Sequence, residues 1–427
     1  MVNLTEFEQK MLNGQAGEFK QKALQFIVNY ADVLGAKDLC EISRATLFIG
    51  AQHYLEGFTT DDYNEIFSKF YLNSDKPIPI GQFDESCAVQ TCVAACVTRD
   101  FATVHLSKEF FDKNNNFYAI TREAGASEVH TCTPYFSGWI PLPGEHFVTT
   151  ESSNVLLCNS VFGACGNADG IEAAVCSAIC GRTPRWGLHI KAERYGNVVF
   201  TIQCPSQTSF DWDVIGYTIG RFLPRAGKPV IAGNFKRPDI KKLRQCFSSL
   251  ATSSNAEICH VVGITPEART VDDALGGKEP AAYFAITQKD YEDTRRLVCD
   301  PGSGPVDFVS IGCPHLAIEE IRDIARYLQG KKVKQGVELW IWTTKSNQAL
   351  ADYNGFTKTI EESGAHLLDS SCPICMKHEA HKHAKAMVLS GIKQAKGLRA
   401  QTAATVYCGE TLTCIDAAIL GRWEAPA

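Results

Sequence analysis

One stretch of the chain decides the fold: VDFVSIGCPHLAIEEIRDIARYLQGKKVKQGVELWIWT, residues 306–343. Its two apolar runs, residues 306–312 and 337–343, have the length and the β-branched content of buried strands. The apolar positions between them recur at helical spacing: Ile321, Ile324, Ala325 and Leu328. A strand, a helix and a second strand of these lengths are typical of a parallel α/β sheet.

The same alternation continues on both sides of this stretch. Upstream, residues 228–233 and 258–264 are expected to be strands, with a helix over 238–252 between them. Downstream, the pattern predicts a helix over 349–360 and then a strand over 365–371. The expected fold class is therefore α/β with parallel sheets.

The chain has 427 residues, which is too long for one compact core and predicts several domains. The first 50 residues favour helices, and residues 131–190 are rich in turn-forming residues, as loops around a site are. We expect an N-terminal α/β lobe over 1–225, with a helical start and substrate loops. A C-terminal α/β lobe over 226–427 should then hold the parallel sheet that carries two candidate metal-binding cysteines.

The composition is that of an ordinary globular protein, with 45% apolar residues, 21% charged residues and a net charge of −6. No long basic stripe is visible, so a nucleic-acid partner is not indicated. The N-terminus lacks the pattern of a signal peptide, and no apolar run approaches the roughly 18–20 residues that span a bilayer. The sequence therefore predicts a cytoplasmic protein without a membrane partner.

Three of the eighteen cysteines stand where a ligand site is expected. Cys313 and Cys372 each follow an expected strand and precede a proline, and ligands gather at the carboxyl ends of parallel strands. Helices expected to start directly after them would favour the thiolate forms. Cys132 lies in a third turn that contains proline. Neighbouring strands are roughly 4.8 Å apart, so these thiols could share one metal or cluster.

Other interpretations of these residues remain open. The cysteines could be packed thiols, and Cys372 with Cys375 forms a CxxC pair of the kind that thiol-redox proteins use. The histidines after this pair, His378, His381 and His383, fit either a metal-binding tail or a solvated polar helix.

The central segment carries many polar groups that suit a small, oxygen-rich, anionic substrate. We expect catalytic roles for Glu145, His146 and Ser153. Candidate substrate-binding residues are Ser152, Asn159, Asn167, Arg182 and His189. Each signal alone is weak, because such arginines often form surface ion pairs and such histidines are often structural.

Several motifs stand out along the chain: TCTPY (131–135), GEH with ESS (144–146 and 151–153), GRTP with GLH (181–184 and 187–189) and IGCPH (311–315). Together they resemble the large subunit of aconitase X, and the resemblance covers nearly the whole chain. The resemblance implies parallel-sheet three-layer sandwiches and an iron–sulfur cluster, of the [4Fe-4S] type, held by Cys132, Cys313 and Cys372. It also implies dehydration of 5-phosphomevalonate or cis-3-hydroxy-L-proline. A separate small swivelling-domain subunit would bring the catalytic serine and form a heterodimer.

Two departures from the family pattern leave the substrate open. Where relatives carry an arginine-containing run, this chain has CGNADG at 165–170, and IPIGQFDESCAVQTC at 78–92 replaces a stretch rich in proline and threonine. Another hydroxy acid therefore remains a candidate substrate. A thiol-redox protein that uses Cys372 and Cys375, or a cluster carrier without activity, is the alternative to a dehydratase.

Overall fold

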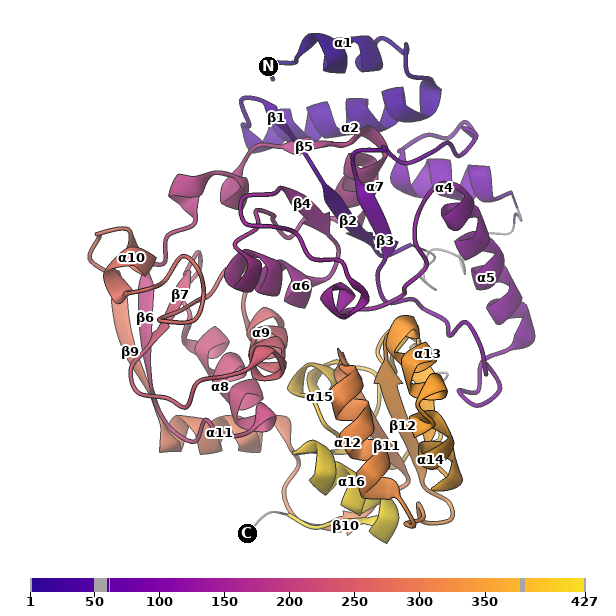
Figure 1. Ribbon diagram of the computed structural model, residues 1–427, viewed down its shortest axis with the longest axis vertical. Coiled ribbons are helices and arrows are strands. Elements are labelled where there is room, and N and C mark those ends of the chain that lie inside the picture. The colour runs from indigo at the N-terminus through magenta and orange to yellow at the C-terminus, as the bar shows by residue number, and fades with distance from the viewer. Residues whose placement is uncertain (1, 50–59, 61, 377–380, 426–427) are drawn as a thin grey trace.

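The computed structural model describes residues 2–49, 60, 62–376 and 381–425, and Figure 1 shows their arrangement. The N-terminal helices lie at the top of this view, and a sheet with the C-terminal helices lies at the bottom. None of the helices in these ranges is long and apolar enough to cross a bilayer.

The N-terminal part is built on a three-stranded parallel sheet, in the order β3 (Ala88–Thr91), β2 (Arg44–Leu47) and β4 (Phe147–Thr149). A small antiparallel pair joins β1 (Leu39–Glu41) to β5 (Arg182–Pro184). The helices of this part are α1 (Glu6–Leu12), α2 (Glu18–Leu34), α4 (Tyr63–Tyr71), α5 (Lys108–Glu123), α6 (Ser152–Leu157) and α7 (Ile171–Cys180). Helix α7 packs on β2 and β4, and α2 covers α7. The predicted helical start is confirmed as far as Leu34, but β1 and β2 lie within the first 50 residues, where helices were expected.

A four-stranded parallel sheet follows, in the order β8 (His260–Val261), β7 (Pro229–Ala232), β6 (Val198–Gln203) and β9 (Ala282–Thr287). Its helices are α8 (Ser209–Phe222), α9 (Ile240–Ser253), α10 (Val271–Leu275) and α11 (Gln288–Val298). The expected strand at 228–233 and helix at 238–252 are confirmed, while the strand expected at 258–264 is reduced to β8. The expected lobe boundary at residue 225 falls between β6 and β7, which are paired.

The last part holds a five-stranded parallel sheet with β11 (Phe308–Leu316) at its centre. Its other strands are β12 (Glu338–Thr343), β13 (His366–Asp369), β14 (Ala386–Leu389) and β15 (Thr405–Cys408), in the order β13-β12-β11-β14-β15. A short antiparallel pair joins β10 (Gly304–Pro305) to β16 (Arg422–Trp423). Side chains of β11 enter a separate apolar core on each face of the sheet, which gives a three-layer sandwich. The predicted α/β class is confirmed.

The helices of this last part differ from expectation in two places. They are α12 (Ile318–Leu328), α13 (Lys345–Tyr353), α14 (Phe356–Glu362), α15 (Ile392–Arg399) and α16 (Thr411–Leu420). The single helix expected at 349–360 is divided, because Gly355 adopts a left-handed conformation with φ of +74° between α13 and α14. Strands β14 and β15 lie beyond the part of the sequence in which strands were expected.

The prediction that a helix starts directly after Cys313 and Cys372 was wrong. Strand β11 continues through Cys313 to Leu316, and α12 begins at Ile318. The pairing of β11 with β12 is irregular after Ile311. Gly312 has φ of +102° there, and a Cβ would lie 2.3 Å from the Trp342 carbonyl oxygen, so the irregularity requires glycine. Cys372 is followed by a turn.

Candidate functional site

The three predicted cysteine ligands, from distant parts of the sequence, line one cavity. Cys132 precedes a 3-10 turn at Pro134–Ser137, Cys313 lies in β11, and Cys372 lies just beyond the end of β13. Strand β12 separates β11 from β13, so Cys313 and Cys372 stand at next-but-one strands, as the sequence allowed. The cavity encloses about 410 Å³ including its mouth, and Cys375 also lines it.

His315 joins the three cysteine-bearing segments. Its Nε2 donates a hydrogen bond to the carbonyl of Ser371 (2.8 Å), so its Nδ1 accepts one from the Thr131 hydroxyl (3.0 Å). Its backbone N–H points to the Cys132 sulfur at 3.4 Å. Burial lowers the pKa of His315 to about 4, which keeps the ring neutral and suited to both contacts. These bonds fix the relative positions of the segments that carry the thiols.

The spacing of the thiols fits a group larger than one ion. Zinc–sulfur bonds are about 2.3 Å long, so sulfurs on one zinc lie at most roughly 4.6 Å apart. Among the residues that the structure describes, two sets of three ligand atoms lie within 4.8 Å of one another. Cys132, Cys313 and Cys372 form neither of them. At least one pair of these sulfur atoms is therefore farther apart than one zinc ion would hold them.

A buried ion pair closes one side of this cavity. The ammonium of Lys393, in the first turn of α15, contacts the carboxylate of Glu151, which caps the N-terminus of α6. Ser153 donates a hydrogen bond from its hydroxyl to the same carboxylate (3.0 Å). Burial alone would raise the pKa of Glu151, but the positive charge of Lys393 lowers it below the usual range. Both groups are therefore charged at neutral pH.

In the CxxC pair, Cys375 holds its proton more tightly than Cys372 does. The Cys375 thiol donates a hydrogen bond to Cys372, which lowers the pKa of Cys372 and raises that of Cys375. Backbone N–H groups of the same turn also favour the Cys372 thiolate. Burial instead raises the pKa values of Cys132 and Cys313. Cys372 is thus the thiol of the cavity that is most ready to bind a metal.

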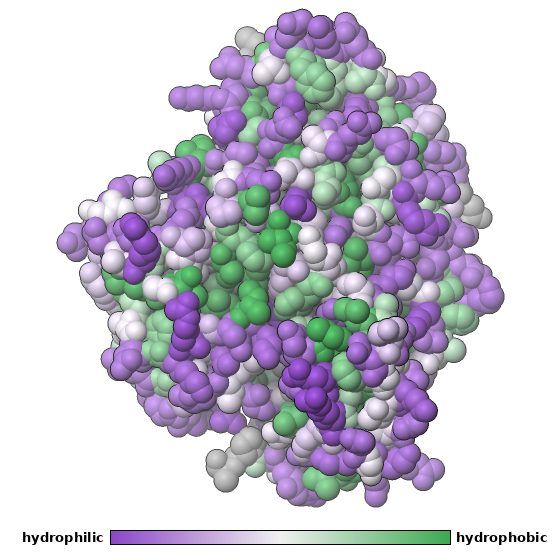
Figure 2. All heavy atoms as spheres, viewed as in Figure 1, coloured by the Kyte–Doolittle hydropathy of each residue, from purple (hydrophilic) through white to green (hydrophobic). Residues whose placement is uncertain are grey.

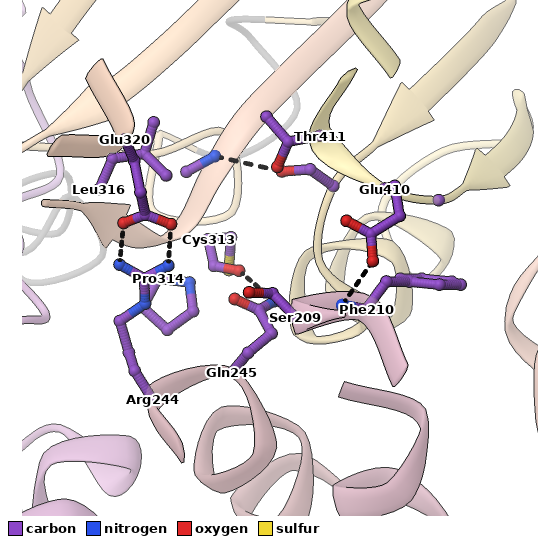
Figure 3. Close-up of a pocket in the computed structure, with 13 residues that line it drawn as sticks. Ser209, Phe210, Arg244, Gln245, Cys313, Pro314, Leu316, Glu320, Glu410 and Thr411 are labelled. Atoms are coloured by element: carbon purple, nitrogen blue, oxygen red, sulfur yellow. Dashed lines mark hydrogen bonds and ion pairs between the residues drawn. The ribbon is translucent and has the colours of Figure 1, made fainter. Parts of the chain in front are cut away.

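A second pocket lies between the Cys313 segment and α9, and side chains that line it hold this segment in place (Figure 3). The Gln245 side chain donates hydrogen bonds to the Cys313 carbonyl (3.0 Å) and to buried Asp213 (3.0 Å). Asp213 also accepts from the N–H of Ile392 (2.8 Å), at the start of α15. Beside them, Arg244 forms a two-pronged ion pair with Glu320. Helices α8 and α9 therefore position Cys313 and Lys393 together.

His146 and His189 lie in a separate pocket of about 820 Å³. Their Nδ1 atoms are 3.0 Å apart, and burial lowers the pKa of both rings, that of His189 to about 3. Strand β4 separates His146 from Glu151, and its three residues span roughly 10 Å. This histidine pocket therefore lies at the opposite end of the sheet from the cysteine cavity.

The remaining predicted site residues line neither of these two cavities: Glu145, Ser152, Asn159, Asn167 and Arg182. Asn159 and Asn167 are buried, and their side-chain amides form hydrogen bonds with backbone groups of neighbouring loops. Arg182 pairs with Glu8, and Glu145 accepts a hydrogen bond from the N–H of Leu142. Ser152 is exposed at the start of α6. Of the predicted catalytic residues, Ser153 reaches the cysteine cavity.

The sequence analysis gave no site role to Glu151, Lys393 or His315, although Glu151 and His315 stand in the ESS and IGCPH motifs. Glu151 follows the end of β4, and Lys393 follows the end of β14, where ligands of parallel sheets gather. Neither β4 nor β14 was expected as a strand, so strand-end position pointed to neither residue. Of the histidines after Cys375, His378 lies outside the described residues, His381 is buried in a turn, and His383 is 3.5 Å from Glu338.

Comparison with known families identifies the three parts of the chain. Models of the first, second and third domains of aconitase X match residues 1–192, 196–296 and 306–420. The chain belongs to the aconitase X family. Each matched domain contains one of the three larger sheets described above. The first and third aconitase X domains supply the cavity thiols, and the second supplies Asp213 and Gln245 behind them.

Two relatives and one solved structure show how close the likeness is. The chain is 28% identical to the phosphomevalonate dehydratase large subunit of Methanosarcina mazei, and the match covers 98% of both chains. It is 25% identical to cis-3-hydroxy-L-proline dehydratase of Hypocrea jecorina, over 99% of this chain and 70% of that one. The holo-form crystal structure of Thermococcus kodakaraensis aconitase X superposes with a TM-score of 0.80 at 25% identity, covering 95% of this chain and 97% of that one.

Proposed function

We propose that this chain is a hydro-lyase, the large subunit of an iron–sulfur dehydratase that removes water from a small hydroxylated carboxylate. One observation carries the proposal: thiols from three distant segments line one cavity beside a buried Lys393–Glu151 pair. The named relatives act on phosphomevalonate and cis-3-hydroxy-L-proline, and both substrates are candidates for this chain. The enzyme would work in the cytoplasm.

The residues of the cavity fit an iron–sulfur cluster. Cys132, Cys313 and Cys372 would hold it, of the [4Fe-4S] type, because thiolates are the usual ligands of such clusters and these three are too widely spaced for one ion. His315 fixes the segments, and Cys375 stabilises the Cys372 thiolate. When bound, such a cluster supplies an iron with a free position, which acts as a Lewis acid on the substrate hydroxyl.

The protein side chains of the cavity provide charge and orientation. The Lys393 ammonium faces the cavity and can bind the carboxylate of the substrate. Glu151 holds Lys393 in place and accepts the hydrogen bond of Ser153, which leaves the Ser153 oxygen free to accept a bond from the substrate. Dehydration also needs a base that takes a proton from the neighbouring carbon. We assign that base to a separate small subunit, and the name 'large subunit' of the relatives supports the existence of such a partner.

The need for a small subunit gives the first prediction. The isolated chain, loaded with iron and sulfide without oxygen, should bind its cluster but turn over slowly. Adding a small subunit of the same family should raise the rate by about 10²–10⁴, the usual contribution of a positioned base. Loss of substrate, followed by NMR with phosphomevalonate and with cis-3-hydroxy-L-proline, measures the rate. Equal turnover by the chain alone would refute the division of the site between two chains.

A thiol-redox function is the second candidate, because Cys372 has a lowered pKa and Cys375 is partly exposed beside it. The two functions differ in colour and in chemistry. A redox protein would be colourless after anaerobic purification and would form a Cys372–Cys375 disulfide reversibly. An iron-loaded, coloured chain that stays inactive with every small subunit and substrate would instead be a cluster carrier.

A further inference from the structure

We propose that Cys40, His146 and His189 form a second metal site, which binds Zn²⁺ in the histidine pocket. The three residues come from separate elements: Cys40 from β1, His146 from the residue before β4, and His189 from a 3-10 turn at Gly187–His189. The site lies at the far end of the sheet from the cysteine cavity. It is therefore independent of the proposed dehydration.

The geometry of the three side chains is close to that of a zinc site. One ligand atom from each lies within 4.8 Å of the other two, and the two Nδ1 atoms are 3.0 Å apart. Zinc bonds are about 2.0–2.1 Å to nitrogen and 2.3 Å to sulfur, so at the tetrahedral angle a nitrogen and a sulfur on one zinc lie roughly 3.6 Å apart. The closing movement that an ion would require is therefore at most about 1.2 Å.

The two histidines already share a proton at the proposed site. Their Nδ1 atoms form a hydrogen bond of 3.0 Å, in which one ring donates and the other accepts. An ion bound by both Nδ1 atoms would take the place of this shared proton, because a metal ligand must present its lone pair. His189 also lines the pocket directly.

The ligand types and their surroundings select zinc. One thiolate and two imidazoles suit Zn²⁺ better than the oxygen-seeking Mg²⁺ or Ca²⁺. Arg194 and Arg185 lie near, but Glu267 neutralises Arg194 at 2.6 Å and Asp38 neutralises Arg185 at 2.8 Å. The charges of these two arginines are therefore compensated when a dication enters the pocket. Lys191 also lines the pocket but is exposed, so solvent screens its charge.

Backbone pairing already fixes the positions of Cys40 and His146. Cys40 pairs with Thr183 in the β1–β5 ladder, and its sulfur contacts the Thr183 carbonyl at 3.7 Å. His146 forms a bridge with Cys165, whose side chain lines the same pocket. Three protein ligands leave the fourth zinc position for water or for the Cys165 thiol. A bound ion would link β1, β4 and the turn at His189, which all belong to the first domain.

Zinc binding to the full chain tests this site. Iron-loaded wild type and variants are titrated with Zn²⁺ against a chromophoric chelator, and zinc and iron per chain are then measured by mass spectrometry. Wild type should retain one tightly bound zinc. His146→Gln and Cys40→Ser should each weaken its affinity by at least about 100-fold, since loss of a partner outside the ligand shell already costs up to about that much. Zinc should also raise the melting temperature of wild type more than that of either variant.

A matched control separates this site from adventitious binding. His105, Glu338 and His383 form the other set with ligand atoms within 4.8 Å, but they are partly exposed. The double variant His105→Gln/His383→Gln should keep the tight zinc. Equal zinc affinity in wild type and His146→Gln, or loss of zinc only in the double variant, would overturn the proposal. Iron content, measured in the same samples, reports separately on the cysteine cavity.

Discussion

Replacing Cys313 by serine is expected to remove the iron of this protein and to lower dehydration by at least about 10³-fold. A Lewis-acid metal is worth several kcal/mol of transition-state stabilisation, and each 1.4 kcal/mol is a factor of ten in rate. Cys313 lies at the centre of the five-stranded sheet, and its backbone is fixed by Gln245. Iron analysis, the visible spectrum and turnover with the small subunit measure the result.

Two other cysteine variants make this experiment specific. Cys414 is buried in the same domain, and its thiol bonds the Gly409 carbonyl, a contact that serine can keep. Cys414→Ser should therefore retain iron and activity. Cys375→Ser should also retain most of its iron, because Cys375 is expected to support Cys372 rather than to bind the cluster. Full iron in Cys313→Ser would contradict the assignment of the ligands.

Replacing Lys393 by methionine is expected to lower turnover while leaving cluster binding intact. Iron content should stay near that of wild type, while turnover with the small subunit should fall by about 10²–10⁴, because a positioned charge that binds the reacting substrate is lost. The variant should also lose stability, by about 3–5 kcal/mol, since Glu151 would remain buried without its partner. Chemical unfolding and steady-state kinetics measure the two effects.

The double variant Lys393→Met/Glu151→Gln is the control for this prediction. Removing both charges should restore much of the stability, because no unpaired charge remains in the cavity. Activity should stay low, since the ammonium is still missing. If the double variant recovered activity together with stability, Lys393 would be a structural residue and its place in the proposed mechanism would be wrong.

The architecture of the cavity was largely readable from the sequence. Residues 306–343 predicted the centre of the sheet, and the prolines that follow them singled out Cys313, which lies within β11, and Cys372, which lies just beyond β13. Cys132 rested mainly on the TCTPY motif, because only a short apolar–polar alternation precedes it. These residues could be found since strand periodicity and turn chemistry are local properties that a single sequence displays.

The polar partners could not be found in the same way. Lys393 faces the cavity because Asp213 fixes the start of α15. Asp213 accepts a hydrogen bond from the N–H of Ile392, which lies 179 positions later in the chain. Arg182 and Asn159 looked like substrate ligands, but tertiary contacts with Glu8 and with the Gly166 backbone use their polar atoms. Such pairings depend on which elements meet in space. Residue type and spacing do not determine them.

The most direct test of the central claim is a Mössbauer spectrum of the ⁵⁷Fe-loaded chain with its small subunit, recorded without and with substrate. Three cysteine ligands predict that one class of iron lacks a protein ligand, and that its signal alone shifts when the substrate binds. Cys313→Ser, loaded in the same way, should show no cluster signal and no shift with substrate. A chain without cluster iron, or a spectrum that does not change while the substrate is being converted, would contradict the account.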